Sequence, residues 1–200
     1  MKRVGFQWVR RGATHSRELA AKRGGSLCRI DFPALVGIIR HPDAGVILFD
    51  TGYDAAFLNA TASFPERFYR WATPVTLDPA PDTGQWLARH GVREADVSGV
   101  ILSHFHGDHV AGLGGFARQR IWCAREGLRD LAAKGRFARV RAGLLAELVP
   151  ADIDARAHYF EECAEAALPP DFAPFTHGRD LIGDGSLLAV ALPRHCPGPS

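Results

Sequence analysis

Three imidazoles and one carboxylate lie close together in the stretch Ser103-His104-Phe105-His106-Gly107-Asp108-His109. Residues 97–103 (VSGVILS) form a continuous apolar run, which is typical of a buried strand. The histidines therefore follow directly on the end of a predicted strand. In an extended segment His104 and His106 point to the same side, because side chains alternate along the chain.

The second half of this stretch changes direction. Gly107 permits a sharp turn, so that Asp108 and His109 can face the same cavity from the start of a short helix. Imidazole nitrogens with a carboxylate oxygen suit Zn²⁺, with Fe or Mn as weaker options. The alternative is a solvated histidine-rich turn, but packing does not explain four potential ligands right after a buried strand. The pattern predicts a metal site.

The composition indicates one folded domain over residues 1–200. Hydrophobic residues make up 46% and charged residues 23% of the chain, close to globular averages. The 24 Lys and Arg residues against 22 Asp and Glu residues give a net charge of +2, which indicates neither a nucleic acid nor a membrane surface as a partner. No apolar run approaches the roughly 20 residues that span a bilayer, and residues 1–12 do not resemble a signal peptide. We therefore expect a cytoplasmic protein.

The remaining pattern is mixed α and β. Apolar runs and turn residues predict a strand hairpin over 34–40 and 45–49, helices over 83–90 (with Thr83 as N-cap), 125–134 and 137–148, and a last strand over 187–192. The proline- and glycine-rich stretches 65–81 and 167–184 are expected to be irregular loops.

The motif HxHxDH after an apolar strand resembles that of the metallo-β-lactamase-fold hydrolases. Two further matches support this resemblance. Asp50-Thr51-Gly52, at the end of the predicted strand 45–49, resembles the family's Asp-containing turn near the metal site. Residues 192–198 (LPRHCPG) resemble the family's PGH-type segment, whose first histidine is a metal ligand. The resemblance runs from about residue 34 to residue 200 and implies an α/β sandwich with the αβ/βα metallo-β-lactamase fold.

The resemblance also implies roles for individual residues. One zinc ion would be held by His104, His106 and His195, and a second by Asp108 and His109. Asp108 would also act in catalysis, by holding the nucleophile or moving a proton. Asp50 would orient a ligand histidine by a hydrogen bond; its alternative role is to cap a turn at the strand end.

The chain departs from the family pattern after the third motif. Arg194 stands where the family commonly has Gly, and Pro199 stands where a second histidine is often found. A bridging aspartate and a final histidine would follow beyond Ser200. We therefore expect a C-terminally truncated member that lacks its last strands and helices, holds one or two zinc ions with the second site incomplete, and is prone to self-association through an exposed apolar edge.

The resemblance implies hydrolysis of a small-molecule ester or lactone by a metal-activated hydroxide. Within the family, secreted β-lactamases, glyoxalase-II-like enzymes and nucleases fit less well than hydrolases similar to acyl-homoserine lactonases. The residues before Ala34 and the aromatic segment 64–71 would suit an apolar pocket wall, although ordinary core packing is the alternative. A non-catalytic, metal-binding remnant is the second hypothesis, and a cysteine-based redox protein relying on Cys196 is a third.

The other histidines and the cysteines carry no further motif. The expected structural or surface histidines are His15, His41, His90, His158 and His177. No CxxC pair is present, so we expect reduced, mostly buried thiols at Cys28, Cys123, Cys163 and Cys196.

Overall fold

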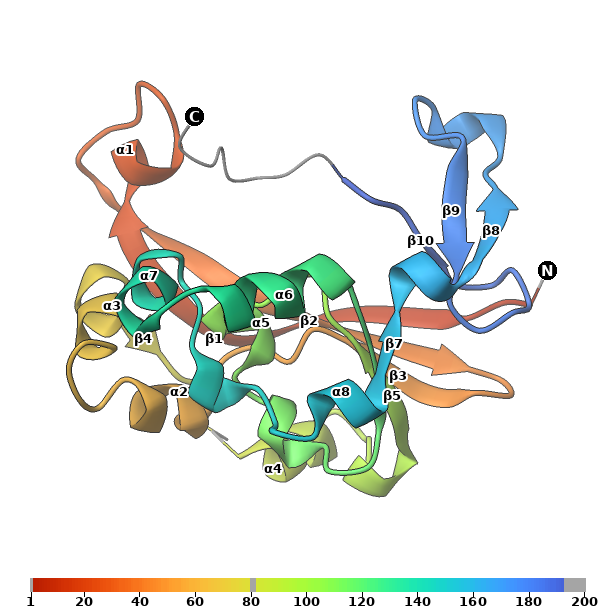
Figure 1. The fold of residues 1–200 in the computed structure, drawn as a ribbon, viewed down its shortest axis with the longest axis horizontal. Helices are drawn as coiled ribbons and strands as arrows, with labels where there is room; N and C mark the ends of the chain where they lie inside the picture. The colour runs from red at the N-terminus through yellow and green to blue at the C-terminus, as the bar shows by residue number, and fades with distance from the viewer. Residues whose placement is uncertain (1, 80–81, 193–200) are drawn as a thin grey trace.

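A seven-stranded mixed sheet in the order β4-β1-β2-β3-β5-β6-β7 forms the centre of the computed structural model, which describes residues 2–79 and 82–192 (Figure 1). Its strands are β1 (Gly5–Arg17), β2 (Arg29–His41), β3 (Gly45–Phe49), β4 (Val75–Thr76), β5 (Val97–Ile101), β6 (Arg120–Cys123) and β7 (Ala157–Tyr159). The first four pair antiparallel, whereas β3, β5, β6 and β7 are parallel neighbours. The carboxyl ends of β3 and β5 therefore meet at one edge of the sheet.

The predicted hairpin is confirmed. β2 and β3 pair from Gly37↔Phe49 to His41↔Gly45, and Gly45 closes the turn with a φ of 77° that glycine adopts without strain. β2 begins earlier than predicted because its first residues pair with β1. The sequence pattern had not indicated β1.

Helices connect the strands, and a second sheet stands at one end of the molecule. The helices are α1 (Glu18–Ala21), α2 (Ala55–Ala60), α3 (Arg67–Ala72), α4 (Thr83–Arg89), α5 (Gly107–Val110), α6 (Arg125–Ala133), α7 (Arg136–Arg141) and α8 (Ile153–Arg156). Short 3-10 turns lie at η1 (Glu94–Asp96), η2 (Leu113–Gly115), η3 (Ala146–Leu148), η4 (Phe160–Glu162) and η5 (Pro170–Phe172). β8 (Ala164–Ala167), β9 (His177–Asp180) and β10 (Leu188–Ala189) form a three-stranded antiparallel sheet. It lies at the opposite end from α1 and α3 (Figure 1).

Each face of the main sheet carries a core, because alternate residues of each central strand belong to different cores. Ile38 and Leu48 join the larger core with buried residues of the helices, including Phe57 and Trp86. Ile47 and its neighbours on the other face pack against residues near the second sheet, in the smaller core of Ile39, Ile47, Ile101, Trp122 and Leu181. This layered α/β arrangement confirms the predicted fold class.

Several boundaries differ from those predicted. The N-cap of α4 is Asp82, whose side chain accepts the Gln85 N–H at 3.0 Å, because the predicted cap Thr83 is buried in side-chain hydrogen bonds. The helix predicted over 137–148 ends at Arg141, and Gly143 follows with a φ of 72°. The strand predicted over 187–192 covers only Leu188–Ala189, which pair with Asp180 and Arg179 of β9.

The two stretches predicted to be irregular contain regular elements. Residues 65–81 include α3 and β4, and residues 167–184 include β9. In the part of the chain that the structure describes, no helix has both the length and the apolar character needed to cross a membrane.

Candidate active site

The histidine stretch lies at the edge of the main sheet where β5 ends. Leu102 still bonds to the next strand through its N–H and the Trp122 carbonyl at 2.8 Å. The chain then runs over the edge to His106, which precedes α5 in an extended conformation. Gly107 is needed here for a reason other than the predicted turn. A β-carbon at this position would lie 2.9 Å from the Phe57 ring, so only glycine lets α5 approach the core this closely.

The three imidazoles of the motif converge. The ring centroids of His104 and His106 lie 4.5 Å apart, and those of His104 and His109 lie 4.0 Å apart. Asp108 joins them, because its Oδ2 lies 3.2 Å from Nε2 of His109. One loop therefore brings four potential metal ligands to the same edge of the sheet. His195, the fifth predicted ligand, lies outside the described residues.

Asp50 lies directly behind the imidazoles. It follows β3, is 2% exposed, and adopts a φ of 60° that is unusual for a residue other than glycine. Its Oδ1 accepts the Ser103 N–H at 2.8 Å, and its Oδ2 accepts the Ser103 hydroxyl at 2.8 Å. Oδ2 also lies 2.7 Å from Nδ1 of His109. The carboxylate thus holds the first and last residues of the motif together.

These hydrogen bonds assign the tautomers of two histidines. An ionised carboxylate only accepts hydrogen bonds, so Nδ1 of His109 carries the proton that faces Asp50. The Ser103 hydroxyl donates to Asp50, and its oxygen therefore accepts the Nδ1–H of His104 at 3.0 Å. In the neutral ring of His104, Nε2 is then the nitrogen with a lone pair, which is the atom that a metal requires. Nε2 of His109 lies 3.2 Å from Oδ2 of Asp108 and becomes such an atom only when its own proton is lost.

The histidines of the cluster differ in the direction in which their pKa values are shifted. Burial, with the charges of His109 and His106, lowers the pKa of His104 to about 4. Burial also lowers the pKa of His106. Burial disfavours charge on His109 too, but the hydrogen bonds and charges of Asp108 and Asp50 outweigh it and raise its pKa to about 10. Burial raises the pKa of Asp108, but the hydrogen bond from His109 and the charge of that ring outweigh burial and hold the pKa below its ordinary value.

This donor set fits a zinc ion. His104 and His106 are neutral near pH 7, so their nitrogens are available as ligands. Asp108 adds an ionised carboxylate beside His109, whose proton a cation would displace. Imidazole and carboxylate together are the common ligands of hydrolytic zinc sites.

Two tyrosines lie beside this cluster, and sequence reasoning missed one of them. Tyr53 and Tyr69 both pack edge to face against Phe57, with centroid distances of 5.0 and 5.5 Å. Burial and the nearby charge of Asp108 raise the pKa of both phenols, so they stay protonated near neutral pH. The aromatic segment 64–71, predicted as a pocket wall, includes Tyr69, whereas no sequence pattern singled out Tyr53.

An apolar cavity of about 310 Å³ adjoins His106. A β-carbon on Gly143, which lines this cavity, would lie 3.2 Å from Cδ2 of the His106 ring. The lining residues are Phe68, Tyr69, Ala72, Thr73, Val140, Arg141 and Gly143.

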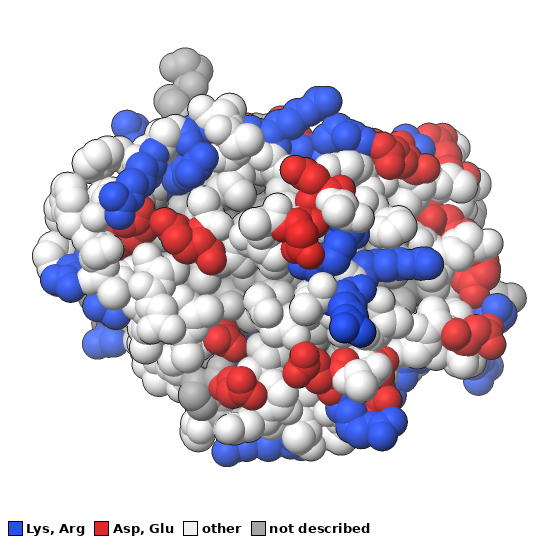
Figure 2. All heavy atoms as spheres, turned by 60° about the horizontal axis from the view of Figure 1, so that its bottom comes forward, with Lys and Arg blue, Asp and Glu red and all other residues white. Residues whose placement is uncertain are grey.

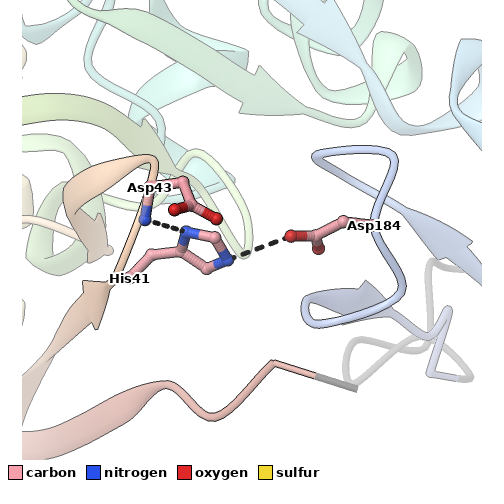
Figure 3. A group of neighbouring side chains, drawn as sticks. All are labelled: His41, Asp43 and Asp184. Atoms are coloured by element: carbon pink, nitrogen blue, oxygen red, sulfur yellow. Dashed lines mark hydrogen bonds and ion pairs between the residues drawn. The ribbon is translucent and has the colours of Figure 1, made fainter.

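A second group of potential ligands is found away from this site, in His41, Asp43 and Asp184 (Figure 3). Its hydrogen bonds argue against a metal. Nδ1 of His41 accepts the backbone N–H groups of Asp43 and Ala44 at 3.1 and 2.9 Å, so Nε2 carries the proton and points it towards Asp184. The Lys2 ammonium lies 2.5 Å from Asp43 and 3.2 Å from Asp184, where it already balances both carboxylates. The group is an ion-pair cluster joining the β2–β3 hairpin to the β9–β10 turn.

Comparison with known proteins identifies relatives of this chain. The sequence pattern of the metallo-beta-lactamase superfamily matches residues 29–200. A crystal structure of a B. thuringiensis AiiA variant with N-decanoyl-L-homoserine bound at its active site aligns with 82% of this chain and 62% of its own, at 17% identity and a TM-score of 0.64. AidC, a dizinc quorum-quenching lactonase in complex with its product, aligns with 80% of this chain and 59% of its own, at 15% identity and a TM-score of 0.51.

The sequence comparison found a different relative. Ribonuclease Z from Nocardia farcinica is 43% identical over 53 residues, which is 26% of this chain and 17% of that protein. The structural likenesses, all at low identity, show the fold. The chain spans about three fifths of the lactonase structures, namely 62% and 59% of their lengths.

Proposed function

The chain belongs to the metallo-beta-lactamase superfamily, and from this premise we propose that it is a zinc-dependent hydrolase of a small-molecule ester or lactone. The observation that carries the proposal is the convergence of His104, His106, Asp108 and His109 on one loop, with Asp50 fixing the ring of His109 at 2.7 Å. Such a held set of nitrogen and oxygen ligands is what a catalytic metal site requires.

Each residue has a defined part in this proposal. His104 and His106, completed by His195, would hold one ion, and Asp108 and His109 would contribute to a second. Bound zinc supplies Lewis acidity, which lowers the pKa of water and polarises a carbonyl group. The Asp108 carboxylate would accept the proton of the attacking water and pass it to the leaving oxygen. Asp50 would keep the nitrogen ligands in the correct tautomer.

The surroundings of the site favour a substrate with an apolar part. Phe64, Phe68, Trp71 and Phe137 are 58%, 49%, 64% and 64% exposed, which excludes core packing as their role. They contact one another edge to face, with Phe68 central between Phe64 at 5.3 Å and Trp71 at 5.4 Å. Phe68 also lines the cavity beside His106. An acyl chain would bury this aromatic surface, and the AiiA and AidC structures hold acyl-homoserine products.

A second candidate activity is phosphodiester hydrolysis, which the local identity to ribonuclease Z favours. The charge distribution gives it less support. Figure 2 shows acidic and basic side chains interspersed over the face that it displays, whereas binding to nucleic acid relies on a concentrated basic surface.

Turnover of the two substrate classes tests the proposal. The zinc-loaded chain should hydrolyse N-decanoyl-homoserine lactone faster than bis(p-nitrophenyl) phosphate, and His106→Ala should abolish the lactone reaction. His177→Ala, an exposed histidine of β9, is the matched control and should retain it. Preference for the phosphodiester would favour the nuclease activity. Zinc binding without turnover of either substrate would overturn the proposal in favour of a non-catalytic remnant.

A further inference from the structure

A buried arginine lies beneath the turn that carries Asp50. Arg11 is 1% exposed, although it is part of a strand whose neighbouring residue Arg10 is exposed. The pairing of β1 with β2 shifts between Arg10 and Ala13, where Gly12 has a φ of 80°. This bulge directs the Arg11 side chain into the core, as bulges commonly re-aim side chains near functional sites.

The Arg11 guanidinium contacts two segments at once, the turn of residues 51–54 and the start of α4. Its Nη1 donates to the Thr51 carbonyl at 2.8 Å. Its Nη2 donates to Thr83 Oγ1 at 2.9 Å, at the start of α4, and pairs with the Asp54 carboxylate. The Arg11 carbonyl also accepts the Tyr53 N–H at 3.0 Å. Residues 51–54 are therefore held by both the backbone and the side chain of Arg11.

The turn that Arg11 holds also contacts the backbone of the histidine motif. The Thr51 N–H and the Thr51 hydroxyl donate to the His109 carbonyl at 2.8 and 2.7 Å. The Gly112 N–H donates to the Thr51 hydroxyl oxygen at 3.0 Å. Asp50, the preceding residue, accepts from the His109 ring. His109 is thus fixed through its carbonyl by Thr51 and through its imidazole by Asp50.

The neighbouring glycines show how closely the chain is built around this arginine. A β-carbon on Gly52 would lie 2.6 Å from Cβ of Arg11, and one on Gly112 would lie 2.3 Å from its Nη1. Asp50 also keeps a positive φ, a conformation that persists only where the surrounding structure imposes it. The guanidinium provides part of that restraint through the next residue.

We propose that Arg11 is a positioning residue of the metal site: by fixing the Asp50–Thr51 turn, it sets the position of His109. The role rests on the proposed function, but it concerns a residue remote from the reacting atoms. Lysine at this position keeps the charge that balances Asp54, but its single ammonium cannot reproduce the planar fork that reaches Thr51 and Thr83 together.

Arg11→Lys tests the proposal, with Arg156→Lys as the matched control. Arg156 is also largely buried, with 13% of its side chain exposed, and donates to the carbonyls of Phe116 and Gln119, none of which belongs to the histidine cluster. We expect Arg11→Lys to weaken Co²⁺ binding about 10- to 100-fold, the usual effect of losing a partner that holds a metal ligand, and to change the Co²⁺ absorption spectrum. Arg156→Lys should lower the melting temperature without changing either measurement.

A measurement on metal-free protein distinguishes failure of this inference from failure of the proposed function. If the parent chain bound no metal, the proposed function would fail, and the imidazole NMR signal of the His109 Nδ1–H would then decide the role of Arg11. We expect that signal in the parent chain and in Arg156→Lys, and its loss in folded Arg11→Lys. Parent-like Co²⁺ affinity and spectrum, or an unchanged His109 signal, in folded Arg11→Lys would overturn the proposal.

Discussion

Asp50 and His109 are joined by a 2.7 Å hydrogen bond across 59 residues of sequence. The contact arises because β3 and β5 are parallel neighbours, with Phe49 opposite Ile101. Each strand therefore delivers its next residues to the same edge, where the Asp50 N–H also donates to the Ile101 carbonyl at 2.8 Å. The sheet itself thus brings the carboxylate to the histidine motif.

This contact predicts the effect of Asp50→Asn. The amide can still accept from Ser103, but its NH₂ group would face Nδ1 of His109 and favour the tautomer with a proton on Nε2. We expect zinc affinity to fall about 10- to 100-fold, measured by competition with a chromogenic chelator. Asp171→Asn, at an exposed aspartate of η5, should bind as the parent does. Equal affinities of the two variants would contradict the role given to Asp50.

Metal content tests the ligand set. We expect about one tightly bound zinc per chain, because Asp108 and His109 alone make an incomplete second site. His106→Ala should remove most of this zinc, as measured by elemental analysis after dialysis. Two zinc ions retained at dissociation constants in the nanomolar range would show that further residues complete the second site.

The cysteines should differ sharply in reactivity. Cys123 is fully buried, and burial raises the pKa of its thiol to about 12, so little thiolate forms at pH 8. Cys28 is exposed. In a chain with Cys196 replaced by serine, iodoacetamide should modify Cys28 in the native protein and Cys123 only after unfolding in urea. Mass spectrometry of the peptides measures this, and rapid native modification of Cys123 would contradict the packing of β6.

An ion pair between α3 and α7 predicts a dependence of stability on pH. The carboxylate of Glu66 accepts from Arg136 at 2.7 and 2.8 Å, and this hydrogen bonding lowers its pKa. A carboxyl group whose pKa is lowered by folding contributes stability above its unfolded pKa of about 4.3, and the contribution is lost as the pH falls through the folded value. Glu66→Gln should therefore lower the melting temperature at pH 7, and the difference from the parent should vanish at acidic pH. A difference independent of pH would contradict the ion pair.

Exposed aromatic side chains on the outer face of the main sheet predict self-association of the chain. Phe6 and Trp8 are 51% and 52% exposed and contact each other at 4.9 Å, and Trp8 also contacts Phe49 at 5.8 Å. An apolar surface of this kind tends to associate. We expect sedimentation of the parent to depend on concentration, and Trp8→Thr to reduce that dependence. Phe172→Ser, at an isolated exposed aromatic residue of η5, should leave it unchanged.

Local sequence patterns were sufficient for some elements of the fold and failed for others. The hairpin of β2 and β3 was predictable because both strands are short apolar runs around a turn. β1 was not, because its exposed face carries Phe6 and Trp8 and its alternation is broken by the bulge before Ala13. The histidine loop was predictable because its ligands are adjacent in sequence.

The supporting residues of the site could not be predicted in the same way. Arg11 is 40 and 72 residues from its partners Thr51 and Thr83, and no local pattern distinguishes it from the exposed arginine beside it. Thr83 resembled a helix cap by its residue type and its position before a helical pattern. Its actual partner, the buried guanidinium of Arg11, is brought to it only by the folded chain. Such contacts become visible only when the topology is known.

The connections around Asp50 have a consequence for synthesis on the ribosome. The turn is held by Arg11, Ser103 and His109, and the arginine also binds Thr83. All of these residues precede β6, which pairs with β5 and shields the parallel core. The contacts of His106 with Gly143 and Leu144 come later, but these residues also precede the second sheet. The histidine loop can therefore assume its arrangement on the emerging polypeptide once Leu144 has left the exit tunnel, before translation reaches the second sheet. Elements made later would dock onto a metal loop that is already formed.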